Sequence, residues 1–437
     1  MICLVGDILT DVTLATANNP LKMRLGGVVH AARALWAMDV EYAVAYFAPD
    51  YMDSHIKMFL KEHDCSNVVK LGNVTNCPYT MLIQEVKEVG NQGYEFLYHE
   101  DIVIDYDFNA IKELNDYEEL MFISGNYDMK AILPHIAVDK TIHCDVANNV
   151  KCVADLPSER LFETLFISTS SLIFQNQYSS FDSFCELLKP YTKRIVLKEN
   201  RGGSRVFDVA SNNIFQIPSQ TLPITHSVGV GDTYDVVSLV APFVNYQDKL
   251  LFASWVAMEY ALTTFPDDFK SSVKTLLHTP FEELKEQPGC ILPWDVREKC
   301  HIYIAAPDFS FVDTKQIDFL CDCLKYHHFV PHRPIKENGQ MTEGAGKTER
   351  VALFCSDMSL LGHCNMLIAV LLYNDPGTLI EIGLAAQRGI PTLVYDPNNI
   401  ATNCMLTELP TLVSSDMDVI ISKVFTEYSK QYSNGTI

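Results

Sequence analysis

Short apolar runs alternate with amphipathic segments in two stretches of this chain. This alternation restricts the folds that the chain can adopt more than any other feature. In the first stretch, residues 1–285, the strand-like runs are Ile2–Val5, Tyr42–Phe47, Leu120–Ser124, Thr141–Asp145, Ser171–Phe174 and Arg194–Lys198. Strands that alternate with helical segments are typical of a parallel sheet covered by helices. We therefore expect an α/β protein.

A second, shorter alternation follows a proline-containing stretch, and residues 286–299 are interpreted as a linker. The elements expected after it are a strand at His301–Ala305, a helix at Asp313–Tyr326, a strand at Met366–Leu372, a helix at Thr378–Arg388 and a strand at Thr392–Tyr395. The predicted domains are thus residues 1–285 and 300–437. Within the first, rough alternation at Thr80–Glu88 and Gly93–Ile104 predicts a β-hairpin that projects from the main sheet.

Charge and cysteine content exclude several classes of function. The 437 residues include 33 Lys and Arg against 55 Asp and Glu, a net charge of −22. Such a surface disfavours nucleic acids and anionic membranes as partners. No apolar run approaches the ~20 residues that a membrane-spanning helix needs. The N-terminus does not resemble a signal peptide, and the 13 cysteines include no CxxC pair, so we expect reduced thiols and a cytoplasmic protein.

A glycine-containing turn in the first domain could bind a phosphate group. Gly229 and Gly231 precede an apolar helical run, so backbone N–H groups and the start of the helix would face one point. Asp232 follows, where a carboxylate could accept a proton from an attacking hydroxyl. The same residues fit an ordinary helix cap with turn glycines, and their spacing does not distinguish the two interpretations.

Three further segments precede this turn in a characteristic order along the chain. They are Gly6–Asp11 after the first strand, Leu25–Val28 before an Ala-rich helix, and Lys198–Phe207 ahead of Asp232. In this order they resemble the ribokinase family (phosphofructokinase-B type) of sugar and nucleoside kinases, over residues 1–285. The resemblance implies a doubly wound sheet with a small β-lid, the lid being the predicted hairpin.

The same resemblance implies roles for individual residues. Asp11, Gly26 and Gly27 would face a sugar, Gly229 and Gly231 would form an anion hole, Asp232 would be the catalytic base, and ATP, used with Mg²⁺, would lie near Gly202 and Gly203.

Three positions depart from the family pattern. His226 stands where the family usually has Asp, Ala31 beside His30 where it has Asn, and Ser179 where the Asn-x-x-Glu motif has its carboxylate. Two alternatives follow for the first domain: it phosphorylates an unusual substrate, or it only binds a nucleotide or nucleoside.

The second domain carries two carboxylates where a strand passes into a helix. Thr378 and Glu381 have the spacing of a capping box, which needs no chemistry. A capping box does not account for Asp375, just before them at the carboxyl end of a strand, where α/β sheets bind ligands. Two carboxylates there could cleave a glycosidic bond, one attacking the sugar carbon and the other managing the leaving group.

The wider pattern resembles the nucleoside 2-deoxyribosyltransferase family, including its nucleotide N-glycosidase relatives, over residues 300–410. The segments that carry the resemblance are His301–Phe309, His332–Gly339, Asp357, Asp375–Gly383 and Thr402–Met405. It implies a smaller Rossmann-like (flavodoxin-like) α/β domain that needs no cofactor.

In this resemblance Glu381 is the nucleophile that forms a covalent ester with the sugar. Asp375 would contact the base or help to protonate it, Tyr303 would orient Glu381, and Phe309 would lie against the base. Asn403 would reach into a neighbouring subunit's site, so we expect a homo-oligomer. The departures at Ala306 and Asn365 do not affect the proposed nucleophile.

Two other patterns are not interpreted as sites. Gly344–Thr348 ends like a P-loop, but Met341 stands where the first glycine is required and no strand precedes it. His327, His328 and His332 lack an acidic or cysteine partner at metal-ligand spacing, so no metal site is predicted.

We therefore expect a two-domain enzyme of nucleotide metabolism that acts on a nucleoside or nucleotide. The leading hypothesis is cleavage or transfer at the N-glycosidic bond of a (deoxy)nucleoside or its 5′-monophosphate. One alternative is a bifunctional salvage enzyme with an active ATP-dependent kinase. Another is a nucleotide-sensing effector in which the kinase fold gates the glycosidase.

Overall fold

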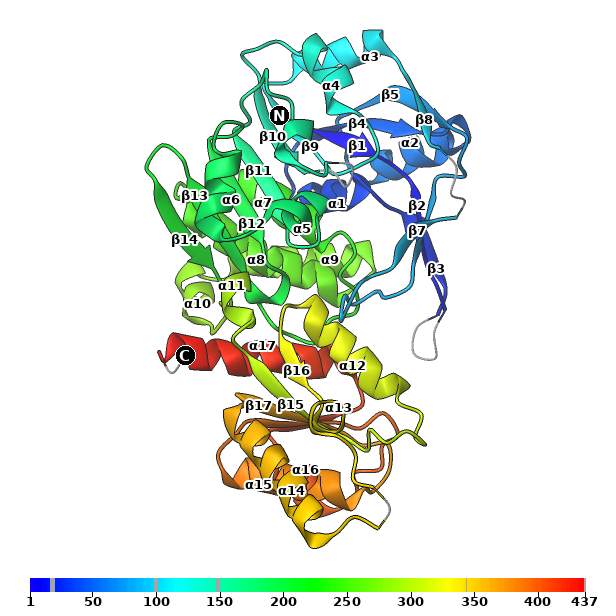
Figure 1. The fold of residues 1–437 in the computed structure, drawn as a ribbon. Coiled ribbons are helices and arrows are strands. Elements are labelled where there is room, and N and C mark those ends of the chain that lie inside the picture. The colour runs from blue at the N-terminus through cyan, green and yellow to red at the C-terminus, as the bar shows by residue number, and fades with distance from the viewer. Residues whose placement is uncertain (16–19, 98–100, 147–149, 343, 436–437) are drawn as a thin grey trace. The chain divides into compact units, whose positions relative to one another are not determined.

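The chain folds into two compact units (Figure 1). The computed structural model describes residues 1–15, 20–97, 101–146, 150–342 and 344–435. The first unit consists of residues 1–87 and 92–291, and the second of residues 88–91 and 292–437. The chain therefore passes between the units three times: before residue 88, after residue 91 and after residue 291.

A ten-stranded sheet forms the centre of the first unit. Seven neighbouring strands, from β12 to β5, run parallel, and antiparallel strands add to both edges. In spatial order the strands are β14 (Asn213–Ile217), β13 (Ser204–Asp208), β12 (Arg194–Lys198), β11 (Thr164–Ser168), β10 (Thr141–Asp145), β9 (Glu119–Phe122), β1 (Ile2–Asp7), β4 (Tyr42–Ala48), β5 (Asn67–Thr75) and β8 (Val103–Tyr106). The strand order reverses beside β1, as in doubly wound sheets, whose ligands bind at such a point.

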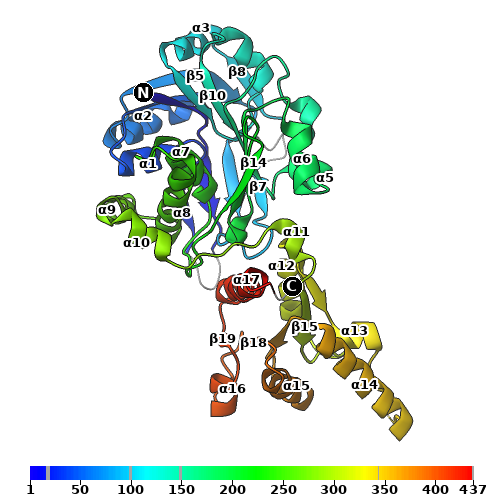
Figure 2. The same ribbon diagram turned by 90° about the vertical axis from the view of Figure 1, so that its left-hand side faces the viewer.

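Helices cover both faces of this sheet, as Figure 2 shows: α1, α7, α8 and α9 lie on one side and α5 and α6 on the other. The first group shares one apolar core, which includes buried residues of α1, α7, α8 and α9. The helices of this unit are α1 (Val29–Ala37), α2 (Asp53–Glu62), α3 (Phe108–Lys112), α4 (Met129–Ile132), α5 (Leu172–Gln177), α6 (Phe181–Leu188), α7 (Val230–Val240), α8 (Tyr246–Leu262), α9 (Pro266–His278) and α10 (Phe281–Glu286).

A separate four-stranded sheet corresponds to the small β-lid. Its order is β3 (Lys22–Leu25), β2 (Thr10–Thr13), β6 (Thr80–Ile83) and β7 (Tyr94–Phe96). The antiparallel pair of β6 and β7 is the predicted hairpin. The second predicted strand, Gly93–Ile104, is in fact divided: β7 belongs to the small sheet, β8 pairs with β5 of the main sheet, and residues 98–100 lie outside the described residues.

The predicted strand at Ser171–Phe174 is wrong. The strand of this region, β11, ends at Ser168, and Leu172–Gln177 forms α5. Ile173 and Phe174 are buried from a helix. A run of four residues, three of them apolar, carries too little periodicity to distinguish a buried strand from a buried helical turn.

The second unit is built on a five-stranded parallel sheet. In spatial order its strands are β16 (Val330–His332), β15 (His301–Ala305), β17 (Met366–Val370), β18 (Thr392–Tyr395) and β19 (Leu412–Ser414). Numbered along the chain, this order is 2-1-3-4-5, which is the flavodoxin-like arrangement. The expected fold class is therefore confirmed for this unit, and the strand order reverses between β15 and β17.

Two groups of helices accompany the sheet of the second unit, and Figure 1 shows them on opposite faces: α12 and α17 on one, and α14, α15 and α16 on the other. Their bounds are α12 (Lys315–Tyr326), α13 (Pro334–Asn338), α14 (Lys347–His363), α15 (Pro376–Gln387), α16 (Cys404–Glu408) and α17 (Met417–Ser433).

The stretch interpreted as a linker contains regular structure. Helix α11 (Trp294–Arg297) lies within it, and Cys290 forms an antiparallel bridge with Ser219.

Among the described residues, no helix combines the length and the apolar character that a membrane span requires.

Candidate active sites

Glu381 lies in the second turn of α15, and its position excludes the capping-box interpretation. The residue that caps this helix is Asp375, whose Oδ2 accepts hydrogen bonds from the Thr378 backbone N–H (2.8 Å) and hydroxyl (3.0 Å). Glu381 instead accepts a hydrogen bond of 2.6 Å from the Tyr303 hydroxyl at its Oε1. A glutamate that does not cap its helix is available for chemistry.

The strand order explains how these residues meet. Tyr303 is fully buried in β15, and Asp375 follows β17, its neighbour in the sheet. The carboxyl ends of these two strands flank the point where the strand order reverses, and ligands of open α/β sheets bind in the crevice outside such ends. The structure thus joins Tyr303 to Glu381 and places Asp375 at the start of the same helix. The catalytic roles of these residues stay predictions.

The Glu381 carboxyl is half-buried and has an unusual proton affinity. Burial raises its pKa to about 7, the like charges of Asp357 and Asp375 act in the same direction, and the hydrogen bond from Tyr303 opposes them. Burial and the adjacent Glu381 charge also raise the pKa of Tyr303, which therefore stays a hydrogen-bond donor. The carboxylate needed for nucleophilic attack forms near neutral pH.

Asp357 is a third carboxylate of this site, and no role was predicted for it from the sequence. It comes from α14, and its Oδ1 accepts a hydrogen bond of 2.8 Å from Asn338 Nδ2 at the end of α13. Its charge affects both Tyr303 and Glu381. The only sequence signal was its place in the family motif.

The other predicted residues of this unit have local contacts. Phe309 is half-buried in the loop after β15 and stacks on Phe311, with ring centroids 5.4 Å apart. Asn403 is exposed and caps its own helix, α16, through a hydrogen bond from the Met405 N–H (2.9 Å). Asn365 accepts a hydrogen bond from the His301 N–H, a structural role. The reach of Asn403 into another subunit stays a prediction.

In the first unit, Gly229 and Gly231 form the start of α7. Gly229 caps the helix in the left-handed conformation (φ +79°), and a Cβ there would lie 2.2 Å from Cγ of His30. Glycine is therefore required both by the backbone and by the histidine ring packed against it. The helix start with these two glycines can hold a phosphate oxygen.

Asp232 lies in the first turn of the same helix. Burial raises the pKa of its carboxyl to about 7, and the like charges of Asp145 and Asp11 add to this, whereas the Lys198 ammonium opposes it. A carboxyl that titrates near neutrality is suited to accept a proton from a substrate hydroxyl. That Asp11 of the lid and Asp232 face one site stays a prediction.

A buried ion cluster that the sequence did not predict adjoins Asp232. Lys198 Nζ lies 2.6 Å from Asp235 Oδ2 and 3.1 Å from Asp145 Oδ1. Burial opposes the charge on Lys198, but the two carboxylates raise its pKa above the usual value. A Cβ on Gly231 would be 3.4 Å from Lys198 Nζ, so the ammonium lies beside the anion hole.

Asp11 is already engaged by protein groups. His30 Nε2 lies 3.0 Å from Asp11 Oδ2, and His30 Nδ1 lies 2.7 Å from the Tyr260 hydroxyl. Burial lowers the pKa of His30 to about 4, so a neutral ring can donate to Asp11 and accept from Tyr260. A Cβ on Gly26 would be 2.3 Å from the Asp11 carboxylate. A sugar at Asp11 would thus also meet the His30 ring.

At the remaining predicted positions, the conformation or close packing of the backbone explains why glycine is present. Gly27 has φ +66°, and a Cβ there would lie 2.1 Å from the Asp7 carbonyl oxygen. Gly203 has φ +90° in the turn after β12, and its Cβ would lie 2.2 Å from the Ile217 carbonyl oxygen. Gly202 is buried in the same turn. ATP binding near Gly202 and Gly203 stays a prediction.

The residues of the first unit fit the phosphate groups of ATP better than they fit the Mg²⁺ ion. The start of α7 suits a phosphate oxygen, as described. For Mg²⁺, Ser179 replaces the family's carboxylate, and Lys198 already neutralises Asp145 and Asp235. Within the described ranges, no group of three or more His, Cys, Asp or Glu side chains is arranged to hold a metal ion.

Comparisons with known proteins found matches for both parts of the chain. The model of the nucleoside 2-deoxyribosyltransferase family matches residues 302–417, which include Tyr303, Asp375, Glu381 and Asn403. No curated protein matches the chain.

Solved structures similar to the chain include three kinases. They are the tetrameric inhibited form of Escherichia coli phosphofructokinase-2 (14% identity, 63% of this chain and 99% of that chain, TM-score 0.47), a Thermotoga maritima ribokinase (12%, 64% and 99%, 0.44) and an Arabidopsis thaliana ribokinase complexed with ribose and ATP (14%, 64% and 99%, 0.46). At these identities the likeness is one of fold. The C-terminal part of the chain therefore resembles the nucleoside 2-deoxyribosyltransferase family, and the N-terminal part resembles the ribokinase family.

We predict that base release at the Glu381 site rises with pH through about pH 7. The attacking group must be deprotonated, and burial raises the pKa of Glu381 to about 7, so activity is lost as the pH falls below that value. Tyr303→Phe removes the hydrogen bond that holds this pKa down and should move the midpoint to higher pH. Asp357→Asn removes a like charge and should move it to lower pH. Profiles of kcat/KM against pH test both, and shifts in the opposite directions would contradict the account.

Proposed function

We propose that the second unit breaks or transfers the N-glycosidic bond of a (deoxy)nucleoside or nucleoside 5′-monophosphate. The observation that carries this proposal is the 2.6 Å hydrogen bond from Tyr303 to Glu381, at the carboxyl edge of the sheet and within the residues that match the family model. The bond orients the half-buried Glu381 carboxyl, and burial raises the pKa of this carboxyl to about 7 although the bond opposes the shift.

The reaction would proceed in two steps through a covalent ester. In the first, a Glu381 oxygen bonds to the anomeric carbon as the bond to the base nitrogen breaks, and the base leaves with the electron pair and takes up a proton. Asp375 is proposed to contact the base or assist this protonation. In the second, water or another base attacks the same carbon, and the ester bond to Glu381 breaks.

For the first unit, two functions remain in consideration. If it is an active kinase, Asp232 is the base that takes the proton of the attacking hydroxyl, and the whole chain is a bifunctional salvage enzyme. If it only binds a nucleotide or nucleoside, the chain is an effector in which ligand binding gates the glycosidase.

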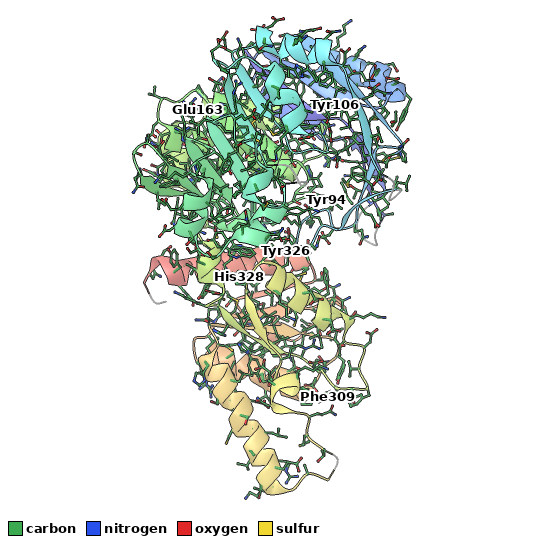
Figure 3. All side chains as sticks on the ribbon, turned by 45° about the horizontal axis from the view of Figure 1, so that its top comes forward. Tyr94, Tyr106, Glu163, Phe309, Tyr326 and His328 are labelled. Carbon is green, nitrogen blue, oxygen red and sulfur yellow. The ribbon has the colours of Figure 1, made fainter. Side chains whose placement is uncertain are left out.

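One segment of the chain favours the gating function. Residues 88–91 belong to the second unit, whereas the chain on both sides of them belongs to the first. Within the second unit, the Tyr326 hydroxyl donates to Glu88 Oε1 (2.8 Å), and His327 Nε2 lies 3.1 Å from the Val89 carbonyl oxygen. Both bonds come from the end of α12; Figure 3 labels Tyr326.

The flanks of this segment are fixed in the first unit beside the anion hole. The Ser227 N–H donates to the Val86 carbonyl oxygen (2.7 Å), and Gln92 Nε2 donates to Ser227 Oγ (2.7 Å). Ser227 precedes Gly229 by two residues. Residues on both sides of the segment 88–91 are thus bound to the turn that leads to Gly229, and this continuity of the chain is what supports the gating proposal.

The quaternary structure proposed for the second unit is a homo-oligomer. Large apolar side chains of α14, α15 and α16 are exposed: Val351 (50%), Phe354 (59%), Ile380 (61%) and Met405 (64%). In Figure 2, α15 lies between α14 and α16, so these side chains come from adjacent helices. Exposed large apolar side chains are common where proteins associate, and a second copy is the proposed partner, because Asn403 caps α16 next to Met405.

We predict that Glu381→Gln abolishes base release while the protein stays folded. The amide can still accept the Tyr303 hydrogen bond, but it is a poor nucleophile, and loss of an essential nucleophile costs on the order of a thousandfold or more. Glu408→Gln, at the exposed end of α16, is the matched control and should leave the rate unchanged. Base release from a panel of nucleosides and nucleotides, followed by chromatography, measures both. Near-normal release by Glu381→Gln would mean that the site has been misassigned.

Asp232→Asn is predicted to remove the activity of the first unit. In a kinase, ATP-dependent phosphorylation falls sharply because the base is lost. In a gating unit, base release by the wild-type chain changes when a nucleotide or nucleoside is added, and the variant loses that response. Asp268→Asn, exposed on α9, is the control. Absence of both phosphorylation and ligand response in the wild type would leave this unit with a scaffold role only.

The last prediction for the proposed function concerns shared sites. Glu381→Gln chains and Asn403→Ala chains should each be inactive alone, and mixing them should restore part of the activity, since mixed assemblies contain intact sites. Full glycosidase activity from a chain with a strictly monomeric mass by light scattering would contradict this.

A further inference from the structure

Arg333 holds the buried carboxylate of Asp308 with one edge of its guanidinium group. Its Nε donates to Asp308 Oδ2 (2.7 Å) and one terminal nitrogen donates to Asp308 Oδ1 (2.6 Å). The Asp308 side chain is only 5% exposed. A bidentate pair of this kind fixes direction as well as distance, because two parallel bonds allow little rotation.

The same guanidinium also reaches a second segment. Its other terminal nitrogen donates to Asp318 Oδ1 (2.5 Å) in α12, and Asp318 Oδ2 accepts a bond from the Thr314 hydroxyl (2.9 Å). The side-chain bonds of Asp308 and Asp318 raise the pKa of Arg333 above its usual value, although burial opposes them. One residue thus ties the loop after β15 to the start of α12.

The position of Arg333 in the sheet connects it with the proposed site. Arg333 directly follows β16, which is the parallel neighbour of β15, so both strands end at the same edge. The loop that it holds begins after β15, which ends two residues beyond Tyr303, at Ala305. Asp308 is followed at once by Phe309, the residue proposed to lie against the base.

Phe309 forms an aromatic pair that continues beyond the family motif. Its ring is parallel to that of Phe311, with an interplanar angle of 5°. Phe311 is 78% exposed, although burying an aromatic side chain is favourable. Figure 3 labels Phe309 in the second unit. A flat ring left exposed in the loop after β15 offers a surface on which a base can stack.

We propose that Arg333 is a positioning residue for the nucleobase: by holding Asp308 it fixes the Phe309–Phe311 ring pair on which the base of the substrate stacks. This inference rests on the proposed N-glycosidic function and adds Arg333 and Phe311 to its base-binding side. The alternative is that the ion pair only stabilises the fold. Buried ion pairs are weak evidence for stability, since their desolvation offsets much of their attraction. The two roles differ in which kinetic constant they change.

The first test uses the four natural 2′-deoxynucleosides and their free bases. Arg333→Met should raise KM about tenfold and weaken inhibition by the free base equally, since stacking contributes this much per base. The value of kcat should change less than about threefold, because Glu381 and Tyr303 are untouched. Arg333→Lys should recover part of the loss, as a point charge pairs with Asp308 without the parallel bonds. A fall in kcat at unchanged KM would overturn the inference.

The second test depends neither on catalysis nor on the folding of an Arg333 variant. Calorimetric titration of the full chain with adenine, guanine, cytosine and thymine should give an affinity that falls about tenfold in Phe311→Ala. Phe319→Ala, a 41% exposed phenylalanine of α12, is the matched control and should leave the affinity unchanged. This result would support the ring pair even if no nucleoside were cleaved, an outcome that contradicts the proposed function alone. Equal affinity in Phe311→Ala, or no base binding by the wild type, would overturn the inference.

Discussion

The hydrogen bond from Tyr303 to Glu381 is the interaction on which the rest of the candidate site depends. It joins a buried strand residue to a helix residue 78 positions later, and it can form only because β15 and β17 are neighbours in the sheet. The hydroxyl fixes one carboxylate oxygen, burial raises the carboxyl pKa to about 7, and the charges of Asp357 and Asp375 act on the same carboxyl. A nucleophile in water would have neither this orientation nor this proton affinity.

The sequence predicted the second unit well because its buried strands are nearly continuous apolar runs. The predicted strand His301–Ala305 has the bounds of β15, and Met366–Leu372 contains β17. Such runs mark strands buried on both faces. Short elements such as β19, three residues long, have too little pattern to be recognised. The role of Asp357 was not predicted for a related reason. In the 17 residues of α14 only Leu361 is buried, so the spacing of apolar residues does not show which face of the helix turns toward Glu381.

The first unit shows a different limit of sequence analysis. The glycines of its motifs were predictable as a pattern, and the structure gives backbone reasons for Gly27, Gly203 and Gly229 that hold whether or not a ligand binds. By contrast, the cluster of Lys198 with Asp145 and Asp235 combines a strand end, a neighbouring strand and a helix. Long-range ion pairs leave no local pattern, so only the sheet order reveals them. Ala31 likewise replaces a family asparagine, and only the structure shows that the neighbouring His30 contacts Asp11.

The covalent role of Glu381 is the central claim, and trapping the intermediate tests it most directly. Incubation with a 2′-deoxy-2′-fluoroarabinosyl nucleoside should leave the sugar on the enzyme, because fluorine next to the anomeric carbon slows hydrolysis of the ester. Mass spectrometry of a protease digest should then find the peptide that contains Glu381 heavier by the fluorinated sugar, and no such adduct in Glu381→Gln. Release of the base without any adduct, or an adduct on the residue Asp375 or Asp357 instead, would contradict the account.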